Sequence, residues 1–494
     1  MGAEQSASEP ESTGVVIIGG GFGGIAAAVR LIRAGVEDFV ILEQSEGPGG
    51  TWWDNRYPGC EVDIPSHAYS FSFTDHDWPR THATQPELQR YAETVLDRFG
   101  LRARLRLGTR VESVTWDEES GRHRVRTARG AGYRCQFVIS AVGLLNVPRY
   151  PDWPGLDGFT GDSFHTARWD EKVQLAGRRV AVVGTGSTAV QIVPAVADSA
   201  ARLYVFQREP GWVEPKGERA FTEAERARFR RSPLYRRLYR LRLFHESTRR
   251  FRAYDAGGRA QKRMRELCLR YLETSVQDPA TRAALTPDYP WGCKRPIYAS
   301  TYYPAFNRDH VTLVPHPVRE ITATGVVDSR GEEDEVDVLI LSTGFQPTRF
   351  LSSFTVTGAD GREIQEAWGD RPRAFLGVTV PGFPNFFILY GPNTNGGFSI
   401  IAQLERQADV AARAIRKVRR RGWKAVDTRE RALERYVRWL DRQFDRHASA
   451  MEAGCNNYYH APSGANVTQW PRTHLAYFLR CRALPRLGLT FRRR

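Results

Sequence analysis

A glycine-rich turn near the start of this 494-residue chain limits its possible folds more than any other feature. A β-branched run at residues 15–18 leads directly into Gly19, Gly21 and Gly24, which are spaced as GxGxxG, and an alanine-rich segment follows. The first glycine permits a tight turn, the second lets the backbone approach a pyrophosphate, and the third lets a helix pack closely on a strand. A second apolar run ends in Glu43, whose carboxylate can accept hydrogen bonds from both hydroxyls of an adenosine ribose. Together these residues predict a Rossmann-type dinucleotide site.

The same pattern recurs in the middle of the chain. The apolar run at 179–183 precedes Gly184, Gly186 and Ser187 in a GxGxxA variant, and the next apolar run ends in Arg208 in place of an acid. A carboxylate at that point would repel a 2′-phosphate, whereas a guanidinium can bind it. The pattern therefore favours NADP(H) over NAD(H) at the second site. The alternative is that Arg208 is a surface arginine of an arginine-rich protein.

Two nucleotide sites in one chain are typical of a flavoprotein that a nicotinamide nucleotide reduces. We therefore predict an α/β fold of two Rossmann-like dinucleotide-binding domains, one for FAD and one for NADPH, with a helical insertion. Apolar runs at 137–143 and 338–344 each end in glycine. They can be strands at which the chain crosses between the domains, or ordinary buried strands. The expected bounds are 1–150 and 376–494 for the FAD domain, 151–215 and 301–375 for the NADP domain, and 216–300 for the insertion.

Within the expected insertion, arginines alternate with apolar residues at helical spacing. Leu234, Leu238, Leu241 and Phe244 form an apolar stripe, which we expect to belong partly to the core and partly to the wall of a substrate tunnel. The arginines between 226 and 270 predict a solvated helical face, with a binding surface as the alternative.

The net charge of +15 raises the question of a nucleic-acid or membrane ligand. Only six of the 71 basic residues are lysines, however, and such a skew is typical of GC-rich coding and needs no ligand to explain it. A basic binding protein that acts on RNA or membranes stays as an alternative; it would be colourless and would bind nucleic acid in a salt-sensitive manner. The prediction is that nucleic acid is not a partner.

The cysteines and the hydropathy argue against several other classes. The six cysteines include no CxxC pair, which disfavours a disulfide framework, a zinc site and the dithiol of a flavin disulfide reductase, and favours a reducing cytoplasm. Cys455 and His460 alone make a poor metal site, so no metal is predicted. The sequence has no apolar run of about 18 residues and no signal-peptide pattern, which predicts no integral membrane association.

The segment from Phe159 to Asp170 gives a more specific pattern. Its sequence, FTGDSFHTARWD, matches FxGxxxHxxxW(P/D) and lies between the two glycine motifs. In this respect the chain resembles the type I Baeyer–Villiger monooxygenases, which are class B flavoprotein monooxygenases. Related N-hydroxylating and flavin-containing monooxygenases usually carry tyrosine or phenylalanine in place of Trp169. The resemblance places His165 at the hinge between the nucleotide domains, where it supports backbone geometry and cofactor movement.

Two further segments carry the resemblance. Residues 49–72 look like the flavin-covering segment of the family, and residues 294–309 resemble the segment that holds its active-site arginine. The resemblance implies that FAD is bound by Gly19, Gly21, Gly24, Glu43, Trp52, Asp63 and Tyr69. It implies that NADPH is bound by Gly184, Gly186, Ser187, Arg208 and Lys294.

The resemblance also implies a reaction. NADPH would reduce FAD, O2 would add to it, and the C4a-peroxyflavin would convert a small-molecule ketone to an ester or lactone, as in secondary or lipophilic-ketone metabolism. Arg295 is the candidate catalytic residue, because its permanent charge can keep the peroxide anionic, and Asp63 would orient its guanidinium. The alternatives are a purely structural Arg295–Asp63 ion pair, and N- or S-oxygenation on the same fold.

The C-terminal region matches the family less closely. Residues 391–397 form a small, amide-rich turn that can approach the flavin ring, and a helix is expected from about Ser399. Tyr458 and Tyr459 stand where relatives often carry a tryptophan–tyrosine pair. The substrate class therefore stays open.

Overall fold

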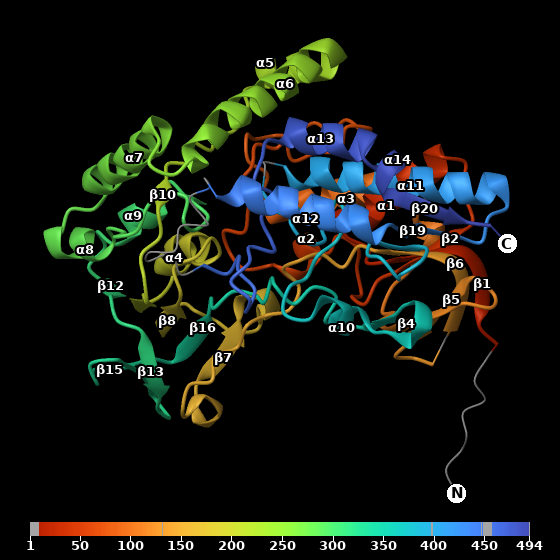
Figure 1. The fold of residues 1–494 in the computed structure, drawn as a ribbon. Coiled ribbons are helices and arrows are strands. Elements are labelled where there is room, and N and C mark those ends of the chain that lie inside the picture. Colours follow the sequence, from red (N-terminus) through yellow and green to blue (C-terminus); the bar gives the residue numbers. More distant parts are fainter. Residues whose placement is uncertain (1–8, 131, 397–398, 446, 448–456, 494) are drawn as a thin grey trace, which may run out of the picture.

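The computed structural model describes residues 9–130, 132–396, 399–445, 447 and 457–493. Two sheets organise these residues, and they lie in different halves of the molecule (Figure 1). The larger sheet has the strand order β17-β4-β5-β6-β1-β2-β3, and β18 also pairs with β6. Its strands are β1 (Glu11–Ile18), β2 (Phe39–Leu42), β3 (Leu105–Arg106), β4 (Val111–Asp117), β5 (Arg122–Thr127), β6 (Gly132–Ser140), β17 (Thr355–Thr357) and β18 (Phe386–Ile388).

The centre of the larger sheet is parallel because β3, β2, β1, β6 and β18 all run in the same direction. Val15, Val16 and Ile17 are fully buried, as expected for a parallel strand that is covered on both faces. Helix α1 (Phe22–Arg33) follows β1, and its small residues let it pack against α11 (Ile400–Arg421). Ser399 caps α11, which confirms the predicted start of that helix.

The other helices of this half are α2 (Thr51–Asp54), α3 (Gln85–Arg98), α10 (Ile364–Trp368), α12 (Glu430–Phe444), α13 (His474–Ala483) and α14 (Pro485–Gly488). The short strands β19 (Ala425–Thr428) and β20 (Leu489–Arg492) pair with each other.

The second sheet is wholly parallel and has the order β12-β9-β8-β16-β7. Its strands are β7 (Asp162–His165), β8 (Arg179–Val183), β9 (Arg202–Phe206), β12 (Val311–Val314) and β16 (Val338–Leu341). Helix α4 (Ala189–Ala197) follows β8 and packs against α9 (Tyr302–Ala305), while β13 (Val318–Ile321), β14 (Gly325–Asp328) and β15 (Glu333–Glu335) form a separate antiparallel sheet. Two strand–glycine turn–helix units in one chain confirm the predicted α/β class.

The chain crosses between the halves twice, after β6 and after β16. These are the two apolar runs that end in glycine, and both are central strands. The crossing segments lie side by side, because Pro148 forms a bridge with Phe345 and the amide of Arg149 donates to the carbonyl of Gly344 over 2.9 Å. A ring nitrogen of His165 lies 3.1 Å from the same carbonyl oxygen, so this histidine lies at the crossing. Strand β17 pairs with β4 in the larger sheet, although it precedes residue 376, where the second segment of the FAD domain was expected to begin. The exact domain bounds stay a prediction.

The predicted insertion contains α5 (Glu223–Arg231), α6 (Pro233–Arg250), α7 (Arg259–Ser275) and α8 (Pro279–Ala284). It begins and ends beside the paired strands β10 (Val213–Glu214) and β11 (Ile297–Tyr298). Helices α5 and α6 extend away from the body of the protein (Figure 1). Leu234, Leu238 and Leu241 are 66%, 55% and 64% exposed, so their predicted place in a core or tunnel wall is wrong. Phe244, the fourth member of the stripe, is only partly exposed and packs against His474 of α13.

Four cysteines, Cys60, Cys135, Cys268 and Cys481, are free and buried. Cys293 is disulfide-bonded, so the expectation that the cysteines form no disulfide is wrong at this position. Cys455, which was considered with His460 as a metal ligand, lies outside the described residues. In the described segments, no three His, Cys, Asp or Glu side chains are grouped to hold a metal ion. None of the helices described combines the length and hydropathy needed to cross a bilayer.

Candidate active site

One cavity of about 1270 Å³ lies where the two sheets and the insertion meet. Both glycine turns contribute to its wall. The predicted site residues that line it are Gly19, Gly21, Glu43, Trp52, Asp63, Tyr69, Gly184, Gly186, Ser187, Arg208, Lys294 and Arg295. Gly24 alone of the predicted set does not line it. The structure therefore brings residues from five separate segments of the sequence to one space.

The first glycine turn has the shape that a pyrophosphate needs. Gly21 is the N-cap of α1 and offers no side chain to the first-turn N–H groups, so these groups remain available at the cavity wall. Gly24 lies beneath the turn, and a Cβ atom there would lie 1.9 Å from the carbonyl oxygen of Gly19. Gly19 itself has φ of +108°, which favours glycine. These three glycines fit a dinucleotide phosphate.

Glu43 stands at the end of β2 with its carboxylate fixed by the backbone. The amide of Gly20 donates to Oε2 over 2.6 Å, and the amide of Ser45 donates to Oε1 over 2.8 Å. Burial raises the pKa of Glu43, and these two hydrogen bonds oppose that effect. Because a carboxylate oxygen can accept more than one hydrogen bond, Glu43 keeps acceptor capacity toward a ribose.

Two aromatic side chains cover the same side of the cavity. Trp52 donates from Nε1 to the hydroxyl of Tyr69 over 3.2 Å, and the rings meet edge to face. Tyr69 also packs against Phe22 at the start of α1. Trp52 and Tyr69 thus form an apolar wall beside the first glycine turn.

The second glycine turn is more open than the first. Gly184 has φ of +121°, and a Cβ atom there would lie 2.4 Å from the carbonyl oxygen of Ser342. A Cβ atom at Gly186 would meet nothing within 4 Å, so this glycine and Ser187 face open space. Arg208 follows β9 and is exposed at the cavity wall. The second turn therefore leaves open space beside an exposed guanidinium.

Arg295 and Asp63 form an ion pair in the cavity. Arg295 donates from Nη2 to Oδ2 of Asp63 over 2.7 Å, although the residues are 232 positions apart in the sequence. Burial alone would raise the pKa of Asp63, but the charges of Arg295 and Lys216 outweigh it and hold this pKa below its ordinary value. The charge of Asp63 raises the pKa of Arg295 well above its ordinary value. Both groups are therefore ionised at neutral pH.

Four tyrosines surround this ion pair. Tyr254, Tyr390, Tyr458 and Tyr459 all line the cavity, and each interacts electrostatically with Arg295. Burial raises the pKa of Tyr254 to about 12, against the opposing effect of Arg295. Tyr390 donates from its hydroxyl to Oδ1 of Asn395 over 2.7 Å. Tyr458 and Tyr459 were noted from the sequence, whereas nothing in the spacing of Tyr254 or Tyr390 pointed to the site.

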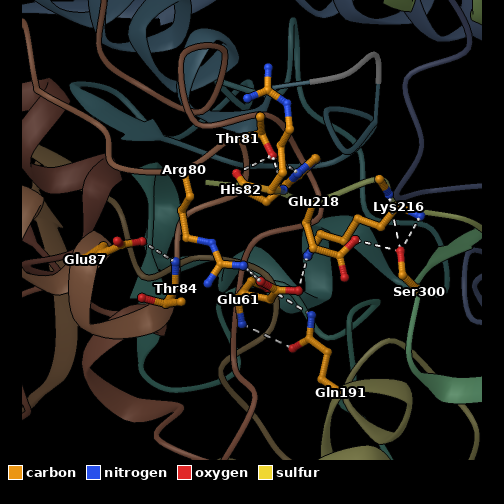
Figure 2. A network of polar contacts seen from close by, with 12 residues as sticks. Glu61, Arg80, Thr81, His82, Thr84, Glu87, Gln191, Lys216, Glu218 and Ser300 are labelled. Carbon is orange, nitrogen blue, oxygen red and sulfur yellow. Dashed lines mark hydrogen bonds and ion pairs between the residues drawn. The ribbon is translucent and has the colours of Figure 1, made fainter. Parts of the chain in front are cut away.

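Sequence reasoning also missed a polar network around Glu61, two residues before Asp63 in the sequence, which Figure 2 shows. Lys216 is only 1% exposed and contacts Glu61 Oε1 over 2.6 Å, while Arg80 approaches Glu61 Oε2 at 3.8 Å. Gln191 of α4 donates from Nε2 to the backbone carbonyl of Glu61 over 2.9 Å. Burial and the charge of Lys216 lower the pKa of His82 to about 4, so its ring is neutral at neutral pH. The network joins the segment that carries Asp63 to the second sheet and to the insertion.

Replacement of Lys216 tests this network. We expect Lys216→Met to lower the free energy of unfolding by about 3 kcal/mol, because it leaves the Glu61 carboxylate without its buried partner. Thermal unfolding followed by circular dichroism measures the change. Lys262→Met, at an exposed position of α7, is the control and should leave the unfolding temperature unchanged. The double variant Glu61→Gln/Lys216→Met should recover part of the loss, and equal unfolding temperatures for Lys216→Met and the parent would contradict the assignment.

Comparison with known proteins identifies the family to which the chain belongs. Residues 16–220 match the family model described as pyridine nucleotide-disulphide oxidoreductase. The chain is 42% identical over 468 residues to a Baeyer–Villiger monooxygenase of Streptomyces coelicolor, covering 94% of this chain and 89% of the relative. It is 39% identical over 475 residues to a Baeyer–Villiger monooxygenase of Pseudomonas aeruginosa, covering 96% and 89%. A solved structure of OTEMO in complex with FAD and NADP superposes with a TM-score of 0.86 at 29% identity, covering 98% of this chain and 100% of that one. With both nucleotide turns, the intervening motif and these similarities over nearly its whole length, the chain belongs to the Baeyer–Villiger monooxygenase family.

Proposed function

We propose that this protein inserts one oxygen atom from O2 beside the carbonyl of a small-molecule ketone, giving an ester or lactone, with Arg295 as the catalytic residue. As a family member, the chain is a flavoprotein monooxygenase that depends on FAD and NADPH. The single observation that supports the role of Arg295 is its place in the cavity that both nucleotide turns share.

FAD, when bound and reduced by NADPH, would supply the two electrons that activate O2, so that one oxygen atom of O2 can be transferred to the ketone and the other leaves as water. Gly19, Gly21 and Gly24 would hold its pyrophosphate, Glu43 its ribose, and Trp52 and Tyr69 would cover it. The turn with Gly184, Gly186 and Ser187 would hold NADPH, and Arg208 and Lys294 would reach its 2′-phosphate. These assignments are supported by the shape of the two turns and the shared cavity.

Arg295 keeps a positive charge at the wall of the cavity. The raised pKa of its guanidinium means that it remains protonated at every working pH, so it stabilises negative charge that develops beside it during oxygen transfer. Its Nη2 donates to Asp63, which fixes the plane of the guanidinium. The opposite charge of Asp63 also lowers the cost of burying Arg295 when nothing else is bound.

Asp63 and the surrounding tyrosines both affect the guanidinium of Arg295. Asp63 is a positioning residue, because it orients Arg295 and does not need to exchange a proton. Tyr254 lines the cavity near Arg295, and its raised pKa keeps its hydroxyl protonated and able to donate a hydrogen bond. Together the aromatic rings exclude water from the reacting groups, which strengthens the electrostatic effect of Arg295.

Arg208 should decide the preference for the phosphorylated nucleotide. We expect Arg208→Ala to raise the Michaelis constant for NADPH by about 30-fold, because a charge-assisted contact to the 2′-phosphate is lost, and to change that for NADH by less than about twofold. Steady-state kinetics with each nucleotide measure both values. Arg202→Ala, at the start of β9 and outside the cavity wall, is the matched control. An equal loss for both nucleotides would mean that Arg208 does not bind the 2′-phosphate.

The reaction is tested with purified, FAD-loaded protein, NADPH and a panel of cyclic and linear ketones. Mass spectrometry of the products should find an ester or lactone for at least one ketone. A parallel panel of amines and sulfides separates this reaction from N- or S-oxygenation. Well-loaded protein that leaves every ketone unchanged but oxidises a sulfide would overturn the proposal.

The proposed partners are therefore a ketone and O2, and we propose a cytoplasmic location, where NADPH is available. Nucleic acid is not required to explain the basic helices. Arg226 and Arg230 both pair with Asp77, and Arg242 pairs with Glu246, so part of the arginine charge is offset within the protein.

A further inference from the structure

Lys294, which was predicted to bind NADPH, already has a partner in the structure. Its ammonium group forms an ion pair with the carboxylate of Glu209. Its Nζ also lies 4.5 Å from the ring centre of Tyr289. Glu209 directly follows Arg208, so the loop after β9 presents a basic and an acidic residue in succession.

This loop is held against the second glycine turn. Thr185 of that turn donates from Oγ1 to the backbone carbonyl of Glu209 over 3.0 Å. Tyr289 donates from its hydroxyl to the carbonyl of Pro210 over 2.7 Å, and Trp212 donates from Nε1 to the carbonyl of Tyr289 over 2.9 Å. The backbone of Glu209 is therefore fixed beside the second glycine turn, and its carboxylate pairs with Lys294.

The charges at this part of the wall do not all favour a phosphate. Arg208, Lys294 and Glu209 line the same cavity. Arg208 is positive and exposed, whereas the Lys294–Glu209 pair is neutral as a unit. A 2′-phosphate that approaches Arg208 meets the carboxylate of the next residue, and it gains the full attraction of Lys294 only if the ion pair opens.

We propose that Glu209 is a specificity-determining residue that limits the preference of this protein for NADPH over NADH. Glu209 offsets the charge of Lys294 and opposes the 2′-phosphate, so that Arg208 supplies most of the discrimination. The inference rests on the proposed function, because it takes the second glycine turn as the NADPH site. Glu209 lies outside the second glycine motif and was not among the predicted site residues.

Nucleotide binding to the FAD-loaded enzyme tests the inference without turnover. Titration calorimetry gives the dissociation constants of NADP+ and NAD+ for the parent and for Glu209→Gln, which keeps the size and an acceptor oxygen but removes the charge. We expect the variant to bind NADP+ about fivefold more tightly and NAD+ with unchanged affinity. The gain should shrink at high salt, because exposed charges are screened. The pair 2′,5′-ADP and 5′-AMP should give the same contrast.

A double variant separates charge from local packing. Lys294→Gln alone should weaken NADP+ binding, because Glu209 then faces the phosphate without its partner. Glu209→Gln/Lys294→Gln should return to about the parental affinity, since a neutral pair is replaced by two neutral side chains. A Glu209→Gln variant that binds NADP+ no more tightly, or that gains equally for NAD+, overturns the inference. A parent enzyme that binds FAD but neither nucleotide would instead overturn the proposed function.

Discussion

Arg295→Ala should abolish ester formation while FAD reduction by NADPH remains largely intact. The guanidinium lies in the shared cavity and is held by Asp63, and the proposal gives it one task in the second half of the reaction, which is to stabilise negative charge during oxygen transfer. Removal of a preorganised donor of this kind costs about a thousandfold in rate. Stopped-flow absorbance under anaerobic conditions measures flavin reduction, and product analysis under air measures ester formation.

The interpretation of Arg295→Ala depends on two companion variants. Arg295→Lys keeps the charge without the planar fork, so it should retain more activity than the alanine variant but less than the parent. Arg242→Ala, at an exposed position of α6, should have no effect on either half of the reaction. Ester formation by Arg295→Ala at a rate near that of the parent would remove Arg295 from the mechanism.

Gly24→Val should yield protein that does not retain FAD. A Cβ atom at Gly24 would lie 1.9 Å from the carbonyl oxygen of Gly19, so any side chain there forces α1 away from β1 and distorts the turn that would hold the pyrophosphate. The FAD content after purification should fall at least about tenfold, as should the content after reconstitution. Absorbance of released FAD against protein concentration measures it.

A second glycine is the matched control for this variant. A Cβ atom at Gly158 would meet nothing within 4 Å, so Gly158→Ala should bind FAD like the parent. Circular dichroism shows whether Gly24→Val is folded, and a folded Gly24→Val protein with full FAD content would show that the first glycine turn is not the flavin site.

The parts of the fold that sequence could predict are those set by neighbouring residues. The turns after β1 and β8 follow directly from glycine spacing, because few other residues fit a close approach of helix and strand. The start of α11 follows from Ser399, whose side chain accepts the hydrogen bond that caps the helix. The return of β17 to the larger sheet has no such local signal, since it depends on pairing with β4, more than 200 residues earlier.

Site residues that belong to a sequence motif could be predicted. Site residues that are identified only by contacts between distant segments were missed. Arg295 and Asp63 were found through family resemblance, and the structure places them in contact. Lys216 entered the prediction only as the first residue of the helical insertion. Its ion pair with Glu61 joins residues 155 positions apart, which leaves no local pattern in the sequence. Lys294 was assigned to the nucleotide without its acidic partner for the same reason. The exposed leucines of α6 show the opposite limit, because helical spacing predicts an apolar face but not whether anything covers it.

Anaerobic mixing of the FAD-loaded protein with NADPH tests most directly whether one cavity serves both nucleotides. The account predicts that the visible flavin absorption bleaches with NADPH, and that admission of air together with a ketone restores it as ester forms. Protein that shows no flavin absorption even after reconstitution with FAD, or a bound flavin that NADPH cannot bleach, would contradict the account.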